Sequence, residues 1–257
     1  MTSTHALPPP PFEDAGYATG WPVRAGDVDR NGRLRLDAIA RYLQDIAWED
    51  LNAGGFADSD PTWIVRRTVL DVIRPIRWPD RVTLRRWCSG VSSRWANMRV
   101  RITSDAGGLV ETEAFWINVD ENTGTTARIS DAGFAHLAAT TDHHRLRWTP
   151  MVGEKPPEHS DHDLPYPIRA VDIDLLQHMN NAAYWQAVEQ VLPGFAEVIT
   201  GPHRAIFEYN APITAEQTLR IRPELRPTGL HLWLLAGESI SAAVRISSIP
   251  HPADPKK

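Results

Sequence analysis

The stretch WPVRAGDVD at residues 21–29 returns as YPIRAVDID at residues 166–174, an offset of 145 residues. Five of the nine positions are identical, and three others exchange one aromatic or one branched aliphatic residue for another. Each copy is followed by apolar residues at three- and four-residue steps, a pattern typical of an amphipathic helix. These helices are predicted to begin near Asp37 and near Asn181. The chain therefore contains one structural unit twice.

Beyond each helix the pattern changes to alternation of apolar and polar residues, with turn residues between the segments. Strands are predicted near 63–73, 81–89, 95–103 and 109–119, and again near 204–210, 218–223, 230–236 and 242–248. One strand, one long helix and a meander of four or five strands indicate an α+β unit in which an antiparallel sheet wraps around a central helix. This is the hotdog architecture, so we expect a tandem (double) hotdog.

The segment between the two copies predicts the domain boundaries. Residues 149–165 contain four prolines and several charges without any periodicity, which is typical of a linker. We therefore expect one hotdog over 20–148 and a second over 166–250, with flexible tails at 1–19 and 251–257.

Composition excludes several classes of protein. The 257 residues are 42% hydrophobic and 23% charged, as in folded soluble chains. A formal charge of −5 argues against a protein that coats nucleic acid or an anionic membrane. The single cysteine, Cys88, excludes an internal disulfide and a Cys-rich metal site, and it fits a reducing cytoplasm. No apolar run approaches the ~18–20 residues of a membrane span, and the N-terminus does not read as a signal peptide. A cytoplasmic protein is expected.

The two copies differ most just before the second helix. LQHMNN at residues 176–181 stands where the first copy has NGRLRL at residues 31–36. A histidine and two asparagines thus follow Asp174, close to a helix start whose free N–H groups can stabilise an oxyanion. We therefore expect the second half to carry the chemistry.

Each polar residue of this segment has a functional and a structural interpretation. Asp174 and His178 are the candidate catalytic pair, although a lone histidine is often structural. Asn180 and Asn181 are candidates for the oxyanion site and for substrate positioning, while helix capping is the other interpretation. Asp172 is an accessory candidate, but the first copy has the same aspartate, which equally favours a shared role in the turn.

The second half resembles the second domain of plant and bacterial acyl-ACP (acyl carrier protein) thioesterases, through the motif R-x-x-D-x-D-x-x-x-H-x-N-N-x-x-Y over residues 169–184. The first half is similar to the family's N-terminal domain, notably in RPIRWPD at residues 74–80, and the likeness covers residues 20–248. This resemblance implies a double hotdog that releases fatty acids from acyl-ACP in fatty acid biosynthesis. It also implies ACP as the partner and the first hotdog as the site of the acyl chain.

The resemblance places the family's catalytic Asp and His on Asp174 and His178, but other positions depart from the family. The catalytic Asn between them is replaced by Leu176, and a Glu followed by Cys is replaced by Pro212 and Ile213. No thiol nucleophile can therefore act at that position.

Other signals and alternatives stay open from the sequence. Glu208 is an accessory candidate for the missing carboxylate, although four residues of strand amount to about 13 Å. Ten arginines against two acidic residues in 66–101 indicate either a docking site for acidic ACP or a solvated sheet face. An acyl-CoA thioesterase, a non-catalytic acyl-thioester-binding protein and a homodimer remain alternatives. An enoyl-thioester hydratase is disfavoured because its Asp and His are usually five residues apart, and here the separation is four or six.

No cofactor is expected, because the chain lacks the glycine-rich nucleotide-binding motifs. The His143-His144 pair and the triplet at 161–163 do not predict a metal site, since adjacent strand residues point to opposite faces and the triplet lies in the linker.

Overall fold

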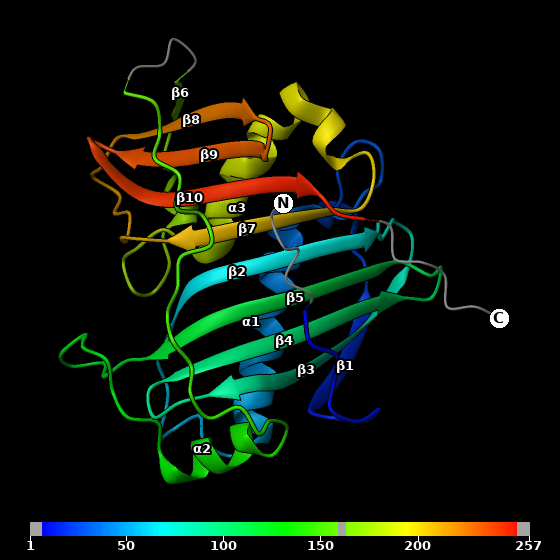
Figure 1. The fold of residues 1–257 in the computed structure, drawn as a ribbon, viewed down its shortest axis with the longest axis vertical. Coiled ribbons are helices and arrows are strands. Elements are labelled where there is room, and N and C mark those ends of the chain that lie inside the picture. Colours follow the sequence, from blue (N-terminus) through cyan, green and yellow to red (C-terminus); the bar gives the residue numbers. More distant parts are fainter. Residues whose placement is uncertain (1–6, 159–162, 251–257) are drawn as a thin grey trace.

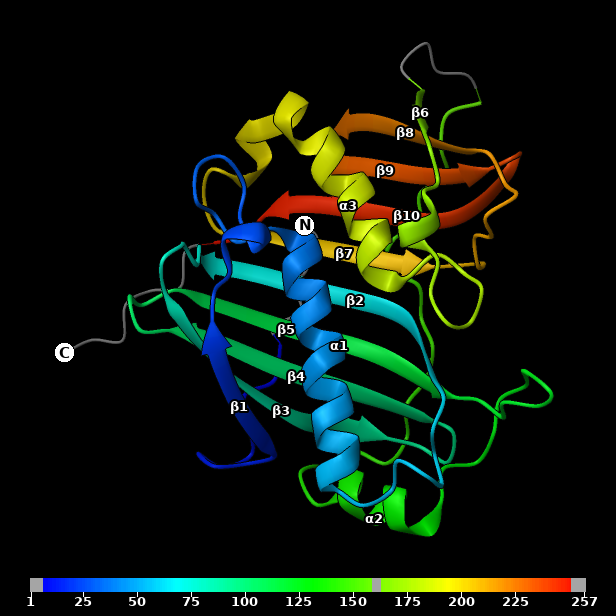
Figure 2. The same ribbon diagram turned by 180° about the vertical axis from the view of Figure 1, so that it is seen from behind.

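The computed structural model describes residues 7–158 and 163–250 as one ten-stranded antiparallel sheet that curves around two helices. The helices are α1 (Leu36–Ala53) and α3 (Asn181–Val191), and Figure 2 shows both on the same face of the sheet. Figure 1 shows the opposite face, with the strands in front of the helices.

The strands follow the predicted segments closely. In the first half they are β1 (Tyr17–Pro22), β2 (Trp63–Arg74), β3 (Arg81–Val91), β4 (Trp95–Ser104) and β5 (Leu109–Asn118). In the second half they are β6 (Leu164–Tyr166), β7 (His203–Tyr209), β8 (Leu219–Arg226), β9 (Gly229–Ala236) and β10 (Ser239–Ser248). The remaining elements are the helix α2 (Asp131–Ala138) and the 3-10 turns η1 (Ala25–Asp27), η2 (Ala170–Asp172) and η3 (Leu192–Ile199).

Strand order repeats the duplication seen in the sequence. The sheet runs β1-β3-β4-β5-β2 and continues as β7-β10-β9-β8-β6, so the second half mirrors the first about the β2–β7 seam. The seam is antiparallel and pairs Arg67 with Glu208 at one end and Val72 with His203 at the other. The predicted double hotdog is confirmed, and its two sheets join edge to edge.

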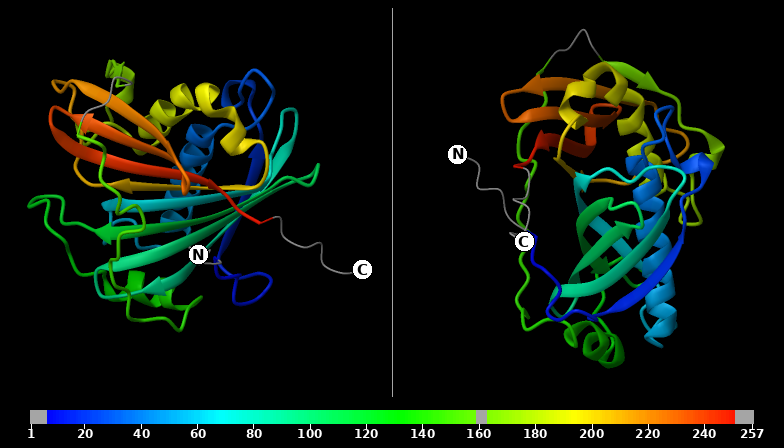
Figure 3. Two further views of the ribbon diagram at one scale, coloured as in Figure 1. Left: turned by 45° about the horizontal axis from the view of Figure 1, so that its top comes forward. Right: turned by 90° about the vertical axis from the view of Figure 1, so that its right-hand side faces the viewer.

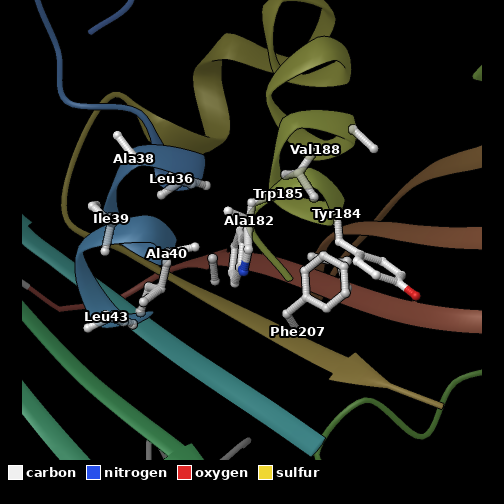
Figure 4. Close-up of a cluster of buried hydrophobic side chains, with 14 of the residues drawn as sticks. Leu36, Ala38, Ile39, Ala40, Leu43, Ala182, Tyr184, Trp185, Val188 and Phe207 are labelled. Carbon is white, nitrogen blue, oxygen red and sulfur yellow. The ribbon is translucent and has the colours of Figure 1, made fainter. Parts of the chain in front are cut away.

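The main core lies between the sheet and the two helices. Figure 4 shows Trp185 of α3 between α1 and the strands, with Tyr184 and Phe207 beside it. The Trp185 indole N–H donates to the Tyr209 hydroxyl at 2.9 Å, so even the polar atom of this buried ring is satisfied. Apolar residues of both helices and both half-sheets share this one core, which therefore joins the halves firmly.

Residues 149–158 of the segment expected to be a linker form a strap across the other face of the sheet, as Figures 1 and 3 show. Arg67 donates to the carbonyl of Thr149 at 2.8 Å, and the Trp233 indole donates to the carbonyl of Glu154 at 3.1 Å. Val152 of the strap joins a second apolar cluster on this face. Arginines on the outer face thus hold the strap rather than only meeting water.

Two further differences from the sequence expectations concern short segments. β1 begins at Tyr17, so the end of the expected 1–19 tail pairs with β3 as a strand. The helix α2 was not predicted, although Ser130 caps it by accepting a hydrogen bond from the Gly133 N–H at 3.0 Å. Among the described residues, no helix has both the length and the apolar character needed to cross a membrane.

Candidate functional site

The loop before α3 is a tight hairpin that brings the candidate residues together. Ile173 and Met179 form an antiparallel bridge, and the Asp174 N–H donates to the His178 carbonyl at 2.9 Å. Gln177 closes the turn with a φ of 61°, a left-handed conformation that side chains other than glycine rarely adopt. The corresponding loop of the first half has Gly32 there, with a φ of 73°. The same backbone is thus built twice, once with strain at a non-glycine residue.

The two carboxylate oxygens of Asp174 differ in their hydrogen bonds. Its Oδ1 accepts the Leu176 N–H at 2.9 Å, which holds the side chain in place. Within residues 7–158 and 163–250 its Oδ2 accepts no hydrogen bond. A half-buried carboxylate with one free oxygen can act as a general base or a nucleophile.

The start of α3 offers one unpaired backbone donor. The Asn180 side chain caps the helix by accepting the Ala182 N–H at 2.9 Å, and the Asn180 carbonyl accepts the Ala183 N–H at 2.8 Å. The Asn181 N–H has no acceptor in the described part of the chain. The oxyanion donors expected from the helix start therefore reduce to the Asn181 amide.

A cavity of about 230 Å³ lies between this loop and the first half. Asp174, Leu176 and Asn181 are its lining residues from the second half. Its walls are mainly apolar and aromatic, from α1 and the adjoining strands and loops, and include Ala47, Trp48, Leu51, Phe56, Trp63, Met98 and Trp116. Sequence analysis did not identify these wall residues individually, because they come together only when α1 packs over β2, β4 and β5.

A charged pair limits this cavity near the end of α1. Arg86 lines the cavity and binds the buried carboxylate of Asp50, which also binds His136 at 3.1 Å. Burial opposes ionisation of Asp50, but the hydrogen bond from His136 and the charge of Arg86 outweigh it and lower the pKa of Asp50. The carboxylate therefore stays ionised beside an otherwise apolar space.

A second cavity, of about 300 Å³, is lined by the same loop. His178 and Tyr184 line it, and Asp174, Leu176 and Asn181 line both cavities. Asp174 and Asn181 thus belong to the lining of both cavities. No hydrogen bond joins the side chains of Asp174 and His178 in the described structure, although both border the second cavity.

Tyr184 holds the segment that departs from the family pattern. Its hydroxyl accepts the Ile213 N–H at 3.1 Å and donates to the Ala211 carbonyl at 3.4 Å. Burial raises the pKa of Tyr184 to about 12, so the hydroxyl keeps its proton at neutral pH. Pro212 faces the second cavity, whereas Ile213 is completely buried in the core. Neither side chain offers a functional group to the site.

The two accessory candidates do not join the others. Asp172 is buried, and its carboxylate accepts the Arg169 N–H at 2.8 Å and binds the Arg169 guanidinium at 2.6 Å. Asp27 likewise accepts the Arg24 N–H at 3.3 Å in the first half, which supports the shared role in the turn. Glu208 lies on the outer face of β7, where it accepts the Met151 N–H of the strap at 2.6 Å. Strand alternation thus separates Glu208 from the cavities.

Other reactive or metal-binding candidates also fall away from this site. Burial raises the pKa of Cys88 to about 12, so its thiol is inert at neutral pH. No group of three or more His, Cys, Asp or Glu suited to a metal occurs in the described ranges. Asp161 and His162 lie outside those ranges, and Asp163 binds Arg220 at 2.8 Å and Arg222 at 2.6 Å.

Comparison with known proteins gives matches over both halves. Residues 14–137 match the acyl-ACP thioesterase N-terminal domain, and residues 155–242 match the acyl-ACP thioesterase C-terminal domain. An uncharacterized protein of Mycobacterium tuberculosis is 40% identical over 88% of this chain and 90% of its own length. Oleoyl-acyl carrier protein thioesterase 1 of Arabidopsis thaliana is 24% identical over 69% of this chain and 55% of its own length.

The fold also matches solved structures. The crystal structure of an oleoyl thioesterase (putative) from Lactobacillus plantarum superposes with a TM-score of 0.76 at 19% identity, over 91% of this chain and 96% of that one. At this identity the likeness concerns the fold, which agrees with the double hotdog described above.

Proposed function

The chain belongs to the acyl-ACP thioesterase family, and from this premise we propose that it hydrolyses fatty acyl thioesters carried by acyl carrier protein. The product is a free fatty acid, so the activity belongs to fatty acid biosynthesis. A cytoplasmic location, expected from the single cysteine, is part of the proposal.

One observation carries the proposal: Asp174 and Asn181 line both cavities, and in the described part of the chain one carboxylate oxygen of Asp174 and the Asn181 N–H make no hydrogen bond. The cavity in the first half is walled by tryptophans and aliphatic side chains, which suits an acyl chain. We assign the cavity lined by His178 to the carrier side of the thioester. The reacting carbonyl would then lie between Asp174 and the Asn181 N–H.

The mechanism that follows is hydrolysis in which Asp174 acts as a general base on water. Asp174 removes a proton from water, whose oxygen bonds to the thioester carbon while the carbonyl oxygen becomes an oxyanion at the Asn181 N–H. Collapse breaks the carbon–sulfur bond, and His178 assists return of the proton to the leaving thiolate. Direct attack by the Asp174 carboxylate is the alternative: its oxygen bonds to the thioester carbon, the thiolate leaves, and water hydrolyses the resulting anhydride. Solvent oxygen label recovered in Asp174 would show that this anhydride forms and that water attacks its aspartyl carbon.

The direct test is to incubate the purified protein with acyl-ACP and acyl-CoA series of graded chain length and to measure free fatty acid. Release from acyl-ACP with a higher kcat/KM than from acyl-CoA supports the proposal. Preference for acyl-CoA assigns the chain to acyl-CoA hydrolysis instead. Tight binding of acyl thioester without release assigns the chain a non-catalytic role. This alternative is considered because Leu176, Pro212 and Ile213 replace polar residues of the family.

Filling the apolar cavity should shorten the accepted acyl chain. Ala47 lies one turn beyond Gln44 on α1 and lines the cavity, and Arg86 with Asp50 forms a charged boundary further along the helix. Ala47→Trp should therefore lower kcat/KM on the longest accepted chain by at least ~10-fold, since each excluded methylene forfeits about 0.8 kcal/mol of burial. The shortest substrates serve as the internal control. Equal loss on all chain lengths would contradict an acyl site here.

We expect the carrier to contact arginines at the end of the sheet that borders the second cavity, called the site end below. Arg66 lines the second cavity. Arg94 is exposed, and its carbonyl accepts the N–H of Asn118 at 3.0 Å. The neighbours of Asn118 in sequence, Ile117 and Val119, both line the second cavity. Arg77 is exposed beyond the other end of β2, about 35 Å away along the strand. Within the arginine-rich segment 66–101, docking is thus proposed at the site end alone.

Arg94→Glu should lower kcat/KM for acyl-ACP by about 10-fold at low salt, with less loss at high salt, because surface charge acts mainly on encounter with an acidic carrier. Arg77→Glu is the matched control and should change it little. Activity on acyl-pantetheine should stay unchanged in both variants. An equal effect of the two reversals would remove the docking role from the site end.

A further inference from the structure

In the first half, the start of α1 corresponds to the start of α3, and a charged side chain binds there. Glu189 of α3 reaches the N-terminus of α1, where its Oε1 accepts the Leu36 N–H at 2.6 Å. Its Oε2 binds the Arg33 guanidinium at 2.7 Å. The carboxylate thus occupies a backbone donor of the kind that binds anions at helix starts.

The 145-residue offset identifies the same positions in the second half. Leu36 corresponds to Asn181 and Arg33 to His178, and the partner that corresponds to Glu189 is Gln44 on α1. The two hairpins share this backbone hydrogen bond, since the Asp29 N–H donates to the Arg33 carbonyl at 2.8 Å as the Asp174 N–H does to the His178 carbonyl at 2.9 Å. The correspondence therefore holds in three dimensions as well as in sequence.

Gln44 is placed to serve the site. It lines the apolar cavity together with Asp174 and Asn181, although it belongs to the other hotdog. Its side chain is half-buried and makes no hydrogen bond within the described ranges. A neutral amide thus lines the same cavity as Asn181, whereas a carboxylate occupies the matching backbone donor in the first half.

We propose that Gln44 is a catalytic residue whose side-chain N–H donates, with the Asn181 N–H, to the thioester carbonyl oxygen. This inference rests on the proposed hydrolase function and names the second donor of its oxyanion site. A glutamate at this position would bind the Asn181 N–H as Glu189 binds Leu36, and it would repel the developing negative charge. The amide leaves the backbone donor open and adds a donor of its own. It also brings an amide to a site where Leu176 has none.

Gln44 transfers no proton in this scheme. Water adds its oxygen to the thioester carbon, its proton passes to Asp174, and the carbon–sulfur bond breaks as the carbonyl re-forms. The Gln44 amide and the Asn181 amide only stabilise the charge on the oxygen between these two events.

The test compares Gln44→Ala, Gln44→Glu and the matched variant Glu189→Gln in the full chain. Gln44→Ala should lower kcat by about 100-fold, the scale of a lost oxyanion donor, with little change in KM. Gln44→Glu should lower kcat at least as much while Tm rises, because a carboxylate near a helix N-terminus stabilises the fold. Glu189→Gln should do the opposite, leaving kcat within about twofold of wild type and lowering Tm. A structural role of Gln44 would not separate activity from stability in this way.

A second measurement separates failure of this inference from failure of the proposed function. The probe is an acyl-CoA analogue in which a methylene replaces sulfur, so that the carbonyl remains but cannot be hydrolysed. Its Kd should rise at least tenfold in Gln44→Glu and stay unchanged in Glu189→Gln. If the wild-type protein shows no turnover but Gln44→Glu still weakens binding of the analogue, the hydrolase function is wrong and the carbonyl-binding role of Gln44 stands. If kcat and Kd stay near the wild-type values in both Gln44 variants, the carbonyl-binding role of Gln44 is wrong and the hydrolase function stands.

Discussion

Replacing Asp174 with asparagine should lower kcat for acyl thioester hydrolysis by at least ~100-fold, the scale of a lost general acid or base. The substitution keeps the size of the side chain and an oxygen that can accept the Leu176 N–H, so the hairpin should survive. What disappears is the negative charge and the second carboxylate oxygen of a residue that lines both cavities. Steady-state kinetics on acyl-ACP, with Tm measured in parallel, provides the check.

The duplication supplies the control for this prediction. Asp29 occupies the same loop position in the first half, where it accepts the Asn31 N–H at 2.8 Å and lines neither of the two cavities. Asp29→Asn should therefore leave kcat unchanged. Asp172→Asn should affect Tm more than kcat, because its carboxylate is bound to Arg169.

Two companion variants probe the rest of the loop. His178→Ala should also lower turnover strongly, while Leu176→Asn, which restores the residue used by the family, should leave activity unchanged or raise it. If Asp174→Asn and His178→Ala both kept near-wild-type hydrolysis while folded, the site assignment would be withdrawn.

Replacing Arg204 with methionine should cost about 3–5 kcal/mol of unfolding free energy, the effect of breaking a buried ion pair from one side. Arg204 on β7 binds Asp71 on β2 with two hydrogen bonds of 2.6 Å each, across the seam that joins the two halves. Both side chains are only 8% exposed, so the aspartate would be left charged and poorly hydrated. Chemical denaturation monitored by tryptophan fluorescence measures the change.

The double variant Asp71→Leu/Arg204→Met is the control. Because no uncompensated charge remains, it should recover most of the lost stability and give a coupling energy between the two sites. A double variant as unstable as Arg204→Met alone would mean that packing, rather than the orphaned charge, dominates at the seam.

The sequence by itself determined the features that depend on neighbouring residues. Strand alternation, helix periodicity and the repeated nine-residue stretch predicted the tandem hotdog, because each is set by backbone geometry within a few residues. The helix start that follows Asp174 and His178 was predicted for the same reason, because its cap forms between residues two apart along the chain.

Only the tertiary structure decided which distant groups meet. Glu208 sits four residues before Pro212, yet the pleat turns its side chain to the strap and away from the cavities. The Asn181 N–H is free because no carboxylate from α1 reaches it, and Gln44 enters the site from the other half of the chain. The 145-residue offset already paired Gln44 with Glu189, but its meaning appeared only when Glu189 was seen on Leu36. Contacts of this kind depend on how two units join across β2 and β7, which no local pattern of residues encodes.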